Sequence, residues 1–395
     1  MDLATFRDLL TPAGQAALAA ATHARPTDAG FLAAFDALRK RYPAALAKAA
    51  VETVLLRDKG RAKFAAADRL YFTREALEQA SGEVVSRYRA GRFAGFDTVL
   101  DLCCGVGADT LAFAGAGHSV EAVDHDPLRL AMAVANAAAL GLTDRVRCHD
   151  GDVLTMPFPP ADAAFIDPSR RTGERRFLDP EMYQPPLGAV RDRFPAGFPL
   201  AAKVAPGVAR ADLERYDAEA DFVSAGGELK ECVLWFGPLR MARRRATVLP
   251  GSHTLASDAP PACLPAAEVG AFVFDPDPSV VRADLMGLVA DRLAAAAVDY
   301  GVALLTGTTP AATPFAACYR VEHAAPLHVA KLRDYLRAHG VGRVTPLKRA
   351  VDVEVNDLAR KLKLAGPGHR HLILTRNLGK TVAIVAERWE SGPTG

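Results

Sequence analysis

The sequence lacks long hydrophobic runs, a secretory leader and paired cysteines. No apolar run approaches the roughly 20 residues needed to cross a bilayer, which argues against a membrane protein. The first residues, MDLATFRDLL, contain no basic segment followed by an apolar one, so no secretory signal is expected. The six cysteines form no C-x-x-C pair and no His/Cys cluster, which argues against a zinc site and a disulfide framework. We therefore expect a cytoplasmic protein with no metal and no membrane partner.

The chain also lacks a strong excess of charge of one sign. Its formal net charge is +2, which neither requires nor excludes a nucleic-acid partner, so the local distribution of arginine matters more than the sum. Half of the residues are hydrophobic and 24% are charged, as in soluble globular proteins. A length of 395 residues is enough for two or three domains.

Residues 1–92 are rich in alanine and place apolar residues at helical spacing, which predicts a helical N-terminal domain. Thr73 is a candidate N-cap, and a helix is predicted to continue from Ala76 to Arg89. Residues 93–249 alternate short apolar strands with helices, which predicts an α/β domain with a Rossmann-like, doubly wound parallel sheet. The expected strands are Thr98–Leu100, Val120–Val123, Val146–Cys148, Ala163–Ile166, Leu200–Val204, Phe222–Ser224, Cys232–Phe236 and Ala246–Leu249.

Residues 250–265 are rich in Pro, Ala and Ser and are predicted to form a linker. Residues 266–395 are predicted to form a small α+β C-terminal domain. Its expected elements are the strand Phe272–Phe274, a long helix Val280–Val298, the strand Val302–Leu305, the helix Val329–His339, the segment Val341–Val353, and a hairpin of Leu372–Arg376 and Thr381–Ala386.

The segment Asp101-Leu-Cys-Cys-Gly-Val-Gly-Ala-Asp109 combines glycines with carboxylates between a predicted strand and a predicted helix. Gly105 and Gly107 let the backbone turn sharply and approach a ligand closely. The segment differs from the phosphate-binding pattern G-x-G-x-x-G because Thr110 stands at the third glycine. The two flanking carboxylates would repel a pyrophosphate, which disfavours a nicotinamide dehydrogenase. They would attract a ligand with an ammonium and a sulfonium, so we predict S-adenosylmethionine as the cofactor.

Two further acids follow the next predicted strands. Asp124 ends the second strand and would accept hydrogen bonds from both ribose hydroxyls. After the third strand, Asp152 would accept from the adenine amine while the Val153 amide donates to a ring nitrogen. Each acid alone could be a solvated turn residue. The coincidence of Asp101, Asp124 and Asp152 at three successive strand ends favours cofactor binding.

Residues 96–167 resemble the class I S-adenosylmethionine-dependent methyltransferases, on these motifs and on the run Ala-Val-Ala-Asn136-Ala. They look closest to RNA-directed members such as the trimethylguanosine synthases. The run Tyr71-Phe-Thr73-Arg-Glu-Ala is similar to the segment that those enzymes place over the methionine end of the cofactor. Leu347-Lys-Arg349-Ala-Val and Leu372-Ile-Leu-Thr-Arg376 resemble the THUMP-like domain of bacterial methyltransferases. The residues and the resemblance together give a predicted cofactor site of Thr73, Asp101, Cys103, Gly105, Gly107, Asp109, Asp124, His125, Asp152 and Val153.

The fourth predicted strand leads into Asp167-Pro168-Ser169-Arg170. The resembled nucleic-acid amino methyltransferases carry Asp or Asn, two prolines and an aromatic residue here, which hold the target amine and stack on the flipped base. Asp167 and Pro168 match, whereas Ser169 and Arg170 depart from that pattern. We predict Asp167, Pro168 and Arg170 as the catalytic set, with Asp167 orienting the acceptor or taking its proton. Arg170 would stack on a base or hold a phosphate.

Alternatives remain for these acids. Asp167 could be a turn residue that precedes a proline, and Glu228 and Glu231 are reserve candidates for its role.

Basic residues gather in three stretches that suit a phosphate backbone, although nearby acids could equally balance them on a solvated face. The first lies beside the predicted acceptor site, the second follows the last apolar strands, and the third is spread over the C-terminal block. They are Arg170, Arg171, Arg175 and Arg176; Arg240, Arg243, Arg244 and Arg245; and Arg343, Lys348, Arg349, Arg360, Lys361, Lys363, Arg370, Arg376 and Lys380.

The leading hypothesis is a methyltransferase of RNA whose C-terminal domain helps to hold the substrate. A methyltransferase of a protein or small molecule is the first alternative. A catalytically silent RNA-binding protein that retains the cofactor is the second.

Overall fold

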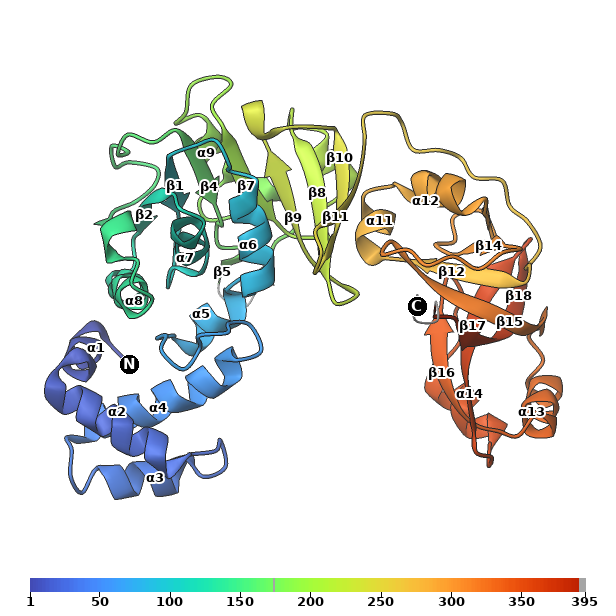
Figure 1. Ribbon diagram of the computed structural model, residues 1–395, viewed down its shortest axis with the longest axis horizontal. Coiled ribbons are helices and arrows are strands. Elements are labelled where there is room, and N and C mark those ends of the chain that lie inside the picture. The colour runs from blue at the N-terminus through green and yellow to red at the C-terminus, as the bar shows by residue number, and fades with distance from the viewer. Residues whose placement is uncertain (173–174, 391–395) are drawn as a thin grey trace, which may run out of the picture. The chain divides into compact units, whose positions relative to one another are not determined.

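A computed structural model describes residues 1–172 and 175–390 of the chain, with the side chains of 171, 172, 355, 356 and 359 left out of the description. The chain divides into two compact units. Unit 1 comprises residues 1–219 and 231–241, and unit 2 comprises residues 220–230 together with the chain from residue 242 onward. Figure 1 shows the elements of each unit. Within the described residues, no helix is long and apolar enough to cross a membrane.

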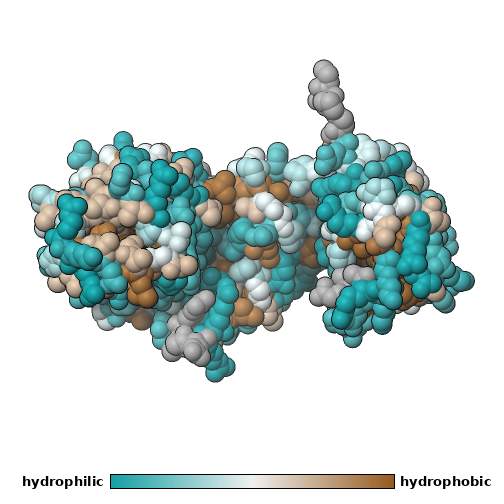
Figure 2. All heavy atoms as spheres, turned by 90° about the horizontal axis from the view of Figure 1, so that it is seen from below, coloured by the Kyte–Doolittle hydropathy of each residue, from teal (hydrophilic) through white to brown (hydrophobic). Residues whose placement is uncertain are grey.

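Unit 1 begins with helices, as predicted. They are α1 (Leu3–Leu10), α2 (Pro12–Ala24), α3 (Phe31–Leu38), α4 (Ala44–Gly60), α5 (Arg74–Gln79) and α6 (Glu83–Gly91). In Figure 2 the face of the first helices, at the left, carries polar side chains interspersed with weakly hydrophobic ones, as is common for alanine-rich helices. Thr73 caps α5, because its Oγ1 accepts a hydrogen bond from the backbone N–H of Ala76.

The continuous helix predicted from Ala76 to Arg89 is wrong, because the chain breaks into α5 and α6. At Ala80 the backbone leaves the helical region, with ψ 136°. The Nζ of Lys63 donates to the carbonyl oxygens of Leu77, Glu78 and Ala80, at 2.7, 3.0 and 2.9 Å. One ammonium thus satisfies carbonyls that a continuing helix would have bonded itself. The consequence is a turn at residues 80–82, next to the sheet, in which Ser81 is buried and its two neighbours are partly buried.

The main sheet of unit 1 has the strand order β9-β7-β4-β1-β2-β3. Its strands are β1 (Thr98–Leu102), β2 (Ser119–Asp124), β3 (Val146–Asp150), β4 (Ala163–Ile166), β7 (Leu200–Val204) and, from residue 231, β9 (Glu228–Trp235). The neighbours from β7 to β3 run parallel. The strand order reverses at β1, and ligands bind at the carboxyl ends of strands beside such a point.

The other helices of unit 1 connect these strands. They are α7 (Ala108–Gly115), α8 (Pro127–Ala139), α9 (Leu187–Arg191) and α10 (Arg210–Leu213), with short 3-10 turns η1 (Thr143–Arg145), η2 (Pro180–Met182) and η3 (Gly237–Leu239). A separate two-stranded ribbon pairs β5 (Arg171–Thr172) with β6 (Arg175–Arg176). Helices α6 and α7 pack side by side (Figure 1).

The sheet departs from the predicted parallel arrangement at β9, which runs antiparallel to β7. The chain reaches β9 from β8 (Glu219–Ala225) through only two residues, Gly226 and Gly227. Both have positive φ, at 62° and 78°, which is typical of a tight hairpin. A connection of two residues reverses the chain direction, whereas a parallel crossover needs about a dozen residues or more.

The N-terminal helices share a hydrophobic core with α8 and the glycine loop, through buried residues that include Phe6, Val106 and Met132. Asn136 adds a buried polar link between these parts. Its Nδ2 donates to the carbonyl oxygens of Tyr71 and Val106, at 3.0 and 2.9 Å. Its Oδ1 accepts from the Tyr71 N–H at 2.7 Å. One side chain, that of Asn136, therefore links the glycine loop to the Tyr71 segment.

Unit 2 contains β8, β10 (Arg244–Leu249) and β11 (His253–Ser257), together with a seven-stranded sheet ordered β13-β14-β12-β15-β18-β17-β16. The strands of that sheet are β12 (Phe272–Pro276), β13 (Ala296–Ala297), β14 (Leu305–Gly307), β15 (Ala316–Pro326), β16 (Val341–Lys348), β17 (Gly368–Asn377) and β18 (Lys380–Arg388). Its helices are α11 (Pro278–Arg282), α12 (Met286–Leu293), α13 (Val329–Ala338) and α14 (Val355–Leu362). The final hairpin, β17 and β18, is confirmed.

Two predictions for unit 2 are wrong, and one strand was not predicted. The long helix Val280–Val298 is divided into α11 and α12 by Asp284, whose φ of 55° is incompatible with a right-handed helix. The predicted linker 250–265 contains β11, which pairs antiparallel with β10. The sequence analysis also missed β15, whose eleven residues alternate in burial and bridge β12 and β18.

Candidate active site

A cavity lies at the carboxyl ends of β1, β2 and β4 in unit 1. Six residues of the predicted cofactor site line it: Asp101, Cys103, Gly105, Asp109, Asp124 and His125. The three predicted catalytic residues, Asp167, Pro168 and Arg170, line the same cavity. The turn between α5 and α6 completes the wall with Ala80 and Ser81. The fold thus brings most of the predicted cofactor residues together with the predicted acceptor residues.

The glycine loop has the backbone geometry that its sequence predicts. Gly105 and Gly107 have φ of 56° and 88°. A Cβ added to Gly105 would meet no atom within 4 Å, so this glycine faces open space, as a close approach to a ligand requires. Asp124 holds the loop: its Oδ2 accepts from the Gly105 N–H at 2.8 Å, and its Oδ1 accepts from the Asp126 N–H at 2.9 Å.

Asp101 is the most deeply buried acid of the cavity wall, with 1% of its surface exposed. Its Oδ2 accepts a hydrogen bond from Thr110 Oγ1 at 2.5 Å. Burial raises the pKa of Asp101 to about 7, against the opposing effects of the Thr110 hydrogen bond and the Arg89 charge. The nearby carboxylates of Asp167 and Asp124 raise this pKa further. The carboxyl group is therefore poised between its two protonation states at neutral pH.

Asp109 has a different environment from Asp101. It lies in the first turn of α7, and its carboxylate forms a buried ion pair with Arg89, whose side chain is fully buried. The second partner of Arg89 is Glu231, at 2.5 and 2.6 Å from Arg89 Nη2. Because Arg89 compensates its charge, Asp109 contributes less to attracting a cation than the sequence pattern suggests. Glu231, a reserve catalytic candidate, serves here as an internal counterion.

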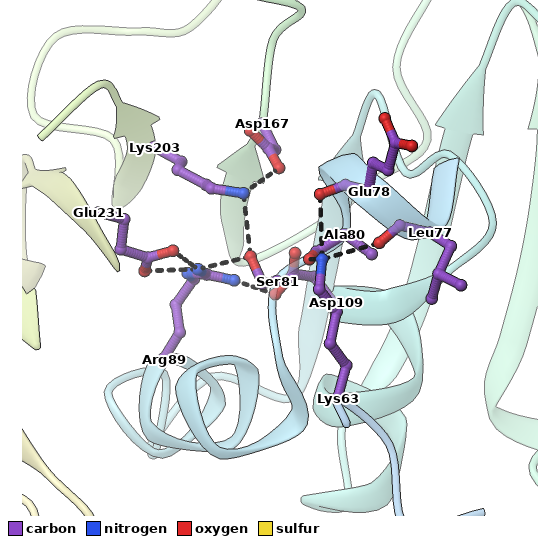
Figure 3. Close-up of polar contacts among 10 residues, drawn as sticks. All are labelled: Lys63, Leu77, Glu78, Ala80, Ser81, Arg89, Asp109, Asp167, Lys203 and Glu231. Atoms are coloured by element: carbon purple, nitrogen blue, oxygen red, sulfur yellow. Dashed lines mark hydrogen bonds and ion pairs between the residues drawn. The ribbon is translucent and has the colours of Figure 1, made fainter. Parts of the chain in front are cut away.

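Asp167 follows β4 and forms an ion pair with a lysine that the sequence analysis missed. Lys203 Nζ lies 2.6 Å from Asp167 Oδ2 and donates a second hydrogen bond to Ser81 Oγ at 2.9 Å. Arg89 Nη2 lies 3.3 Å from the same Ser81 Oγ (Figure 3). A signal was present in the sequence, because Lys203 interrupts the otherwise apolar strand Leu-Ala-Ala-Lys-Val. A lysine inside a buried strand needs a counterion.

Four residues of the predicted cofactor site do not line this cavity: Thr73, Gly107, Asp152 and Val153. Thr73 caps α5 and lines a separate hollow between α3, α4 and α5. Asp152 is exposed, and its Oδ1 accepts from the Leu154 N–H at 2.8 Å. The carbonyl oxygen of the buried Val153 accepts from Arg193 Nη1 at 3.1 Å. The assignment of Asp152 and Val153 to the adenine of the cofactor therefore stays a prediction.

The two loop cysteines show no sign of nucleophilic chemistry. Burial, with the surrounding carboxylates, raises the pKa of Cys103 and of Cys104 well above the ordinary thiol value. Both thiols therefore stay protonated at neutral pH. Among the described residues, no group of three or more His, Cys, Asp or Glu side chains is arranged to hold a metal ion.

The acceptor end of the cavity is formed by residues 167–170. Pro168 is buried, and Ser169 exchanges two backbone hydrogen bonds with Gln184, at 3.0 and 2.9 Å. Arg170 Nη1 is buried and, within the described chain, has no hydrogen-bond partner. No phenylalanine, tyrosine or tryptophan is among the described residues that line the cavity.

The basic stretches are partly neutralised. Arg176 lines the cavity, whereas the side chain of Arg171 lies outside the described residues. In the second stretch Arg240 pairs with Asp217. In the C-terminal block four arginines pair with acids: Arg349 with Asp275, Arg360 with Asp357, Arg370 with Glu322, and Arg376 with Asp299. For these four arginines, a solvated face whose charges are balanced by acids is a better description than a site for a phosphate backbone.

The charges of the cavity suit a cationic ligand. Asp109 and Asp167 have counterions in Arg89 and Lys203. In the part of the chain that the structure describes, Asp101 and Asp124 form no ion pair with a lysine or an arginine. Two carboxylates without a paired cation, beside an open glycine loop, fit an ammonium and a pair of ribose hydroxyls. The residues present therefore fit S-adenosylmethionine.

Comparisons with known proteins agree with this chemistry. The model of the family described as RNA cap guanine-N2 methyltransferase matches residues 96–206. A THUMP domain-like model matches residues 316–388, and a domain of unknown function matches residues 2–60. Two proteins described as uncharacterized S-adenosylmethionine-dependent methyltransferases, from the CDC 1551 and H37Rv strains of Mycobacterium tuberculosis, are each 33% identical over 337 residues. The alignment covers 82% of this chain and 92% of each relative.

The chain belongs to the S-adenosylmethionine-dependent methyltransferases. Its fold is shared with a crystal structure of a protein described as a candidate methyltransferase, from Porphyromonas gingivalis W83. That match has a TM-score of 0.72 and 20% identity, and it covers 92% of this chain and 99% of that one. The enzyme class, the cofactor and the Rossmann-like fold predicted from the sequence are thereby confirmed.

Proposed function

We propose that this methyltransferase acts on RNA and transfers the methyl group to a nitrogen held at residues 167–170. The description of the family that matches residues 96–206, an RNA cap guanine-N2 methyltransferase, supports this proposal. The THUMP domain-like match at residues 316–388 supports it independently, because it lies in a different part of the chain. The observation that carries the proposal is the position of Asp167, which lies at the end of β4 in the same cavity as the cofactor carboxylates.

The cofactor, when bound, supplies a methyl group whose leaving sulfur is already positively charged. The protein therefore contributes mainly position and charge. Asp101 is proposed to pair with the cofactor ammonium, and Asp124 is proposed to accept from the ribose hydroxyls. Both side chains line the cavity, and Asp124 is already fixed by two backbone N–H groups.

At the acceptor, a nitrogen that gains a methyl group must lose a proton. Asp167 is proposed to accept a hydrogen bond from the acceptor N–H and to take that proton. Lys203 occupies Oδ2 of Asp167, which leaves Oδ1 for the acceptor. The carbonyl group of Pro168 would be a second acceptor, since proline fixes the backbone there.

Arg170 is proposed to contact the nucleotide in place of the aromatic residue of the resembled enzymes. Its Nη1 is buried without a partner among the described residues, and such a donor is costly unless a ligand satisfies it. The planar guanidinium can stack on a base or bind a phosphate. Its neighbour Arg176 also lines the cavity.

The test compares modified nucleosides in total RNA, by mass spectrometry, from cells without the protein, with the wild type and with Asp167→Asn. We expect one methylated nucleoside to be present with the wild type and to be lost in the other two. In parallel, radiolabelled cofactor is offered to the RNA, protein and small-molecule fractions of cells that lack the protein. Label in the protein or small-molecule fraction alone, with identical nucleoside profiles, would contradict the RNA proposal.

A further inference from the structure

The acceptor carboxylate has a fixed, buried counterion in Lys203. The side chain of Lys203 is 5% exposed and that of Asp167 is 26% exposed. Their charged atoms lie 2.6 Å apart and form a short, charge-assisted hydrogen bond. Lys203 does not line the cavity, whereas Asp167 does. The lysine therefore contacts Asp167 from behind, on the protein side.

The sheet itself brings the two residues together. Strands β4 and β7 are parallel neighbours, with Phe165 opposite Ala201 and Ile166 opposite Ala202. One step further along this register places Asp167 opposite Lys203. Because Lys203 lies on β7 and Asp167 directly follows β4, the sheet sets the positions of both backbones.

A second contact restricts the ammonium. Lys203 Nζ also donates to Ser81 Oγ at 2.9 Å, and Ser81 belongs to the turn between α5 and α6 that lines the cavity. Arg89 Nη2 lies 3.3 Å from the same oxygen and binds Glu231 on the neighbouring strand β9 (Figure 3). Lys203 is thus held between two polar groups from different elements, and its chain has little freedom to move away from Asp167.

We propose that Lys203 is a positioning residue of the methyl transfer, which fixes the rotamer and negative charge of Asp167 so that Oδ1 faces the acceptor. The proposal rests on the proposed role of Asp167 in accepting a proton. A carboxylate with one oxygen held by a buried ammonium can present only the other oxygen to the acceptor. A carboxylate held at the acceptor nitrogen stabilises the positive charge that develops there during methylation, and then takes the proton. Lys203 acts through Asp167 and does not touch the acceptor itself.

The test is a double-mutant cycle with Lys203→Met, Asp167→Asn and the double variant, and with Lys230→Met as a matched control. Lys230 is an exposed lysine that pairs with Glu228 at 2.5 Å. The acceptor is whichever cellular fraction, RNA, protein or small molecule, the wild type labels with radioactive cofactor. The result for Lys203 can therefore be obtained even if the acceptor is not RNA, and the two proposals fail separately.

We expect Lys203→Met to lower turnover about 10- to 100-fold, the size of effect seen when a group that orients a reactive side chain is removed. The cofactor Kd, measured by calorimetry, should change less than twofold. The double variant should be no slower than Asp167→Asn alone, because the lysine has nothing left to position. Lys203→Arg should recover part of the lost turnover, and Lys230→Met should match the wild type.

Losses in turnover that add in the double variant would overturn the proposal, as would a loss of cofactor affinity that accounts for the whole effect. If Lys203→Met fails to fold, the comparison of Lys203→Arg with the double variant remains, since neither leaves an uncompensated carboxylate. In that case an Arg variant that is faster than the double variant, together with a double variant equal to Asp167→Asn, would support the proposal. An Arg variant as slow as the double variant would contradict it.

Discussion

The raised pKa of Asp101 predicts that cofactor affinity falls as the pH falls through neutrality. Only the ionised carboxylate can pair with the cofactor ammonium, so the apparent Kd is the intrinsic Kd divided by the ionised fraction. With a pKa of about 7, roughly three quarters of the Asp101 carboxyl groups are ionised at pH 7.5 and roughly one tenth at pH 6.0. We therefore expect the affinity for S-adenosylmethionine to weaken about eightfold between these two pH values.

The sign of the effect distinguishes it from titration of the cofactor itself. The α-amino group of the cofactor has an ordinary pKa near 8, so it becomes more fully charged as the pH falls, which would strengthen binding. The folding free energy has the opposite dependence from cofactor binding. An acid whose pKa is raised in the folded state, here from 3.8 to about 7, makes the cofactor-free protein more stable as the pH falls across that interval.

Isothermal titration calorimetry at pH 7.5 and 6.0, on the wild type and on Asp101→Asn, measures this dependence. The variant should bind at least about 30-fold more weakly at pH 7.5, because an ion pair has lost one partner. It should also lose the weakening between pH 7.5 and 6.0. A wild-type Kd that is constant or tighter at pH 6.0 would refute the assignment of Asp101 to the cofactor ammonium, and so would a variant that keeps the eightfold dependence.

Two further substitutions test how the loop is held. Gly107→Ala should lower the free energy of unfolding, measured by denaturant titration, by about 1–3 kcal/mol, because φ is 88° and the new Cβ would lie 3.2 Å from the Ala133 Cβ. The control is Gly91→Ala, an exposed position with open space around the new Cβ and no positive φ. This control substitution should cost no stability. Asn136→Ala should cost about 3 kcal/mol in the same assay, since it leaves the backbone groups of Tyr71 and Val106 without partners in a buried site. Ordinary surface substitutions change the free energy of unfolding by up to roughly 0.5 kcal/mol. A change no larger than that would contradict either expectation.

The parallel half of the main sheet could be predicted because its signals are local. The strands Ala163–Ile166 and Leu200–Val204 were predicted with the bounds that the structure has. Each is a continuous apolar run, which is typical of a strand buried on both faces. The antiparallel β9 was predicted as a strand, but its direction was missed. The Gly226-Gly227 pair that reverses the chain was the available signal.

Elements that depend on tertiary contacts were missed. The break between α5 and α6 depends on Lys63, which lies outside both helices and contacts their linking segment only in the folded chain. The strand β15 is held by its pairing with β12 and β18, and its own sequence gives a weak signal. The pattern of local propensities could identify neither, since the deciding partners are distant in sequence.

The sequence by itself determined the cofactor. Acids at successive strand ends and a glycine loop that excludes phosphate are local patterns, and a parallel sheet must gather the carboxyl ends of its strands at one edge. The tertiary structure decided how those acids differ. Asp109 is neutralised by Arg89, and Asp167 is paired with Lys203. Asp101 forms no ion pair with a lysine or an arginine among the described residues, and burial raises its pKa to about 7. Burial and pairing depend on residues far apart in the chain, so the charge of each acid could only be assigned once the chain had folded.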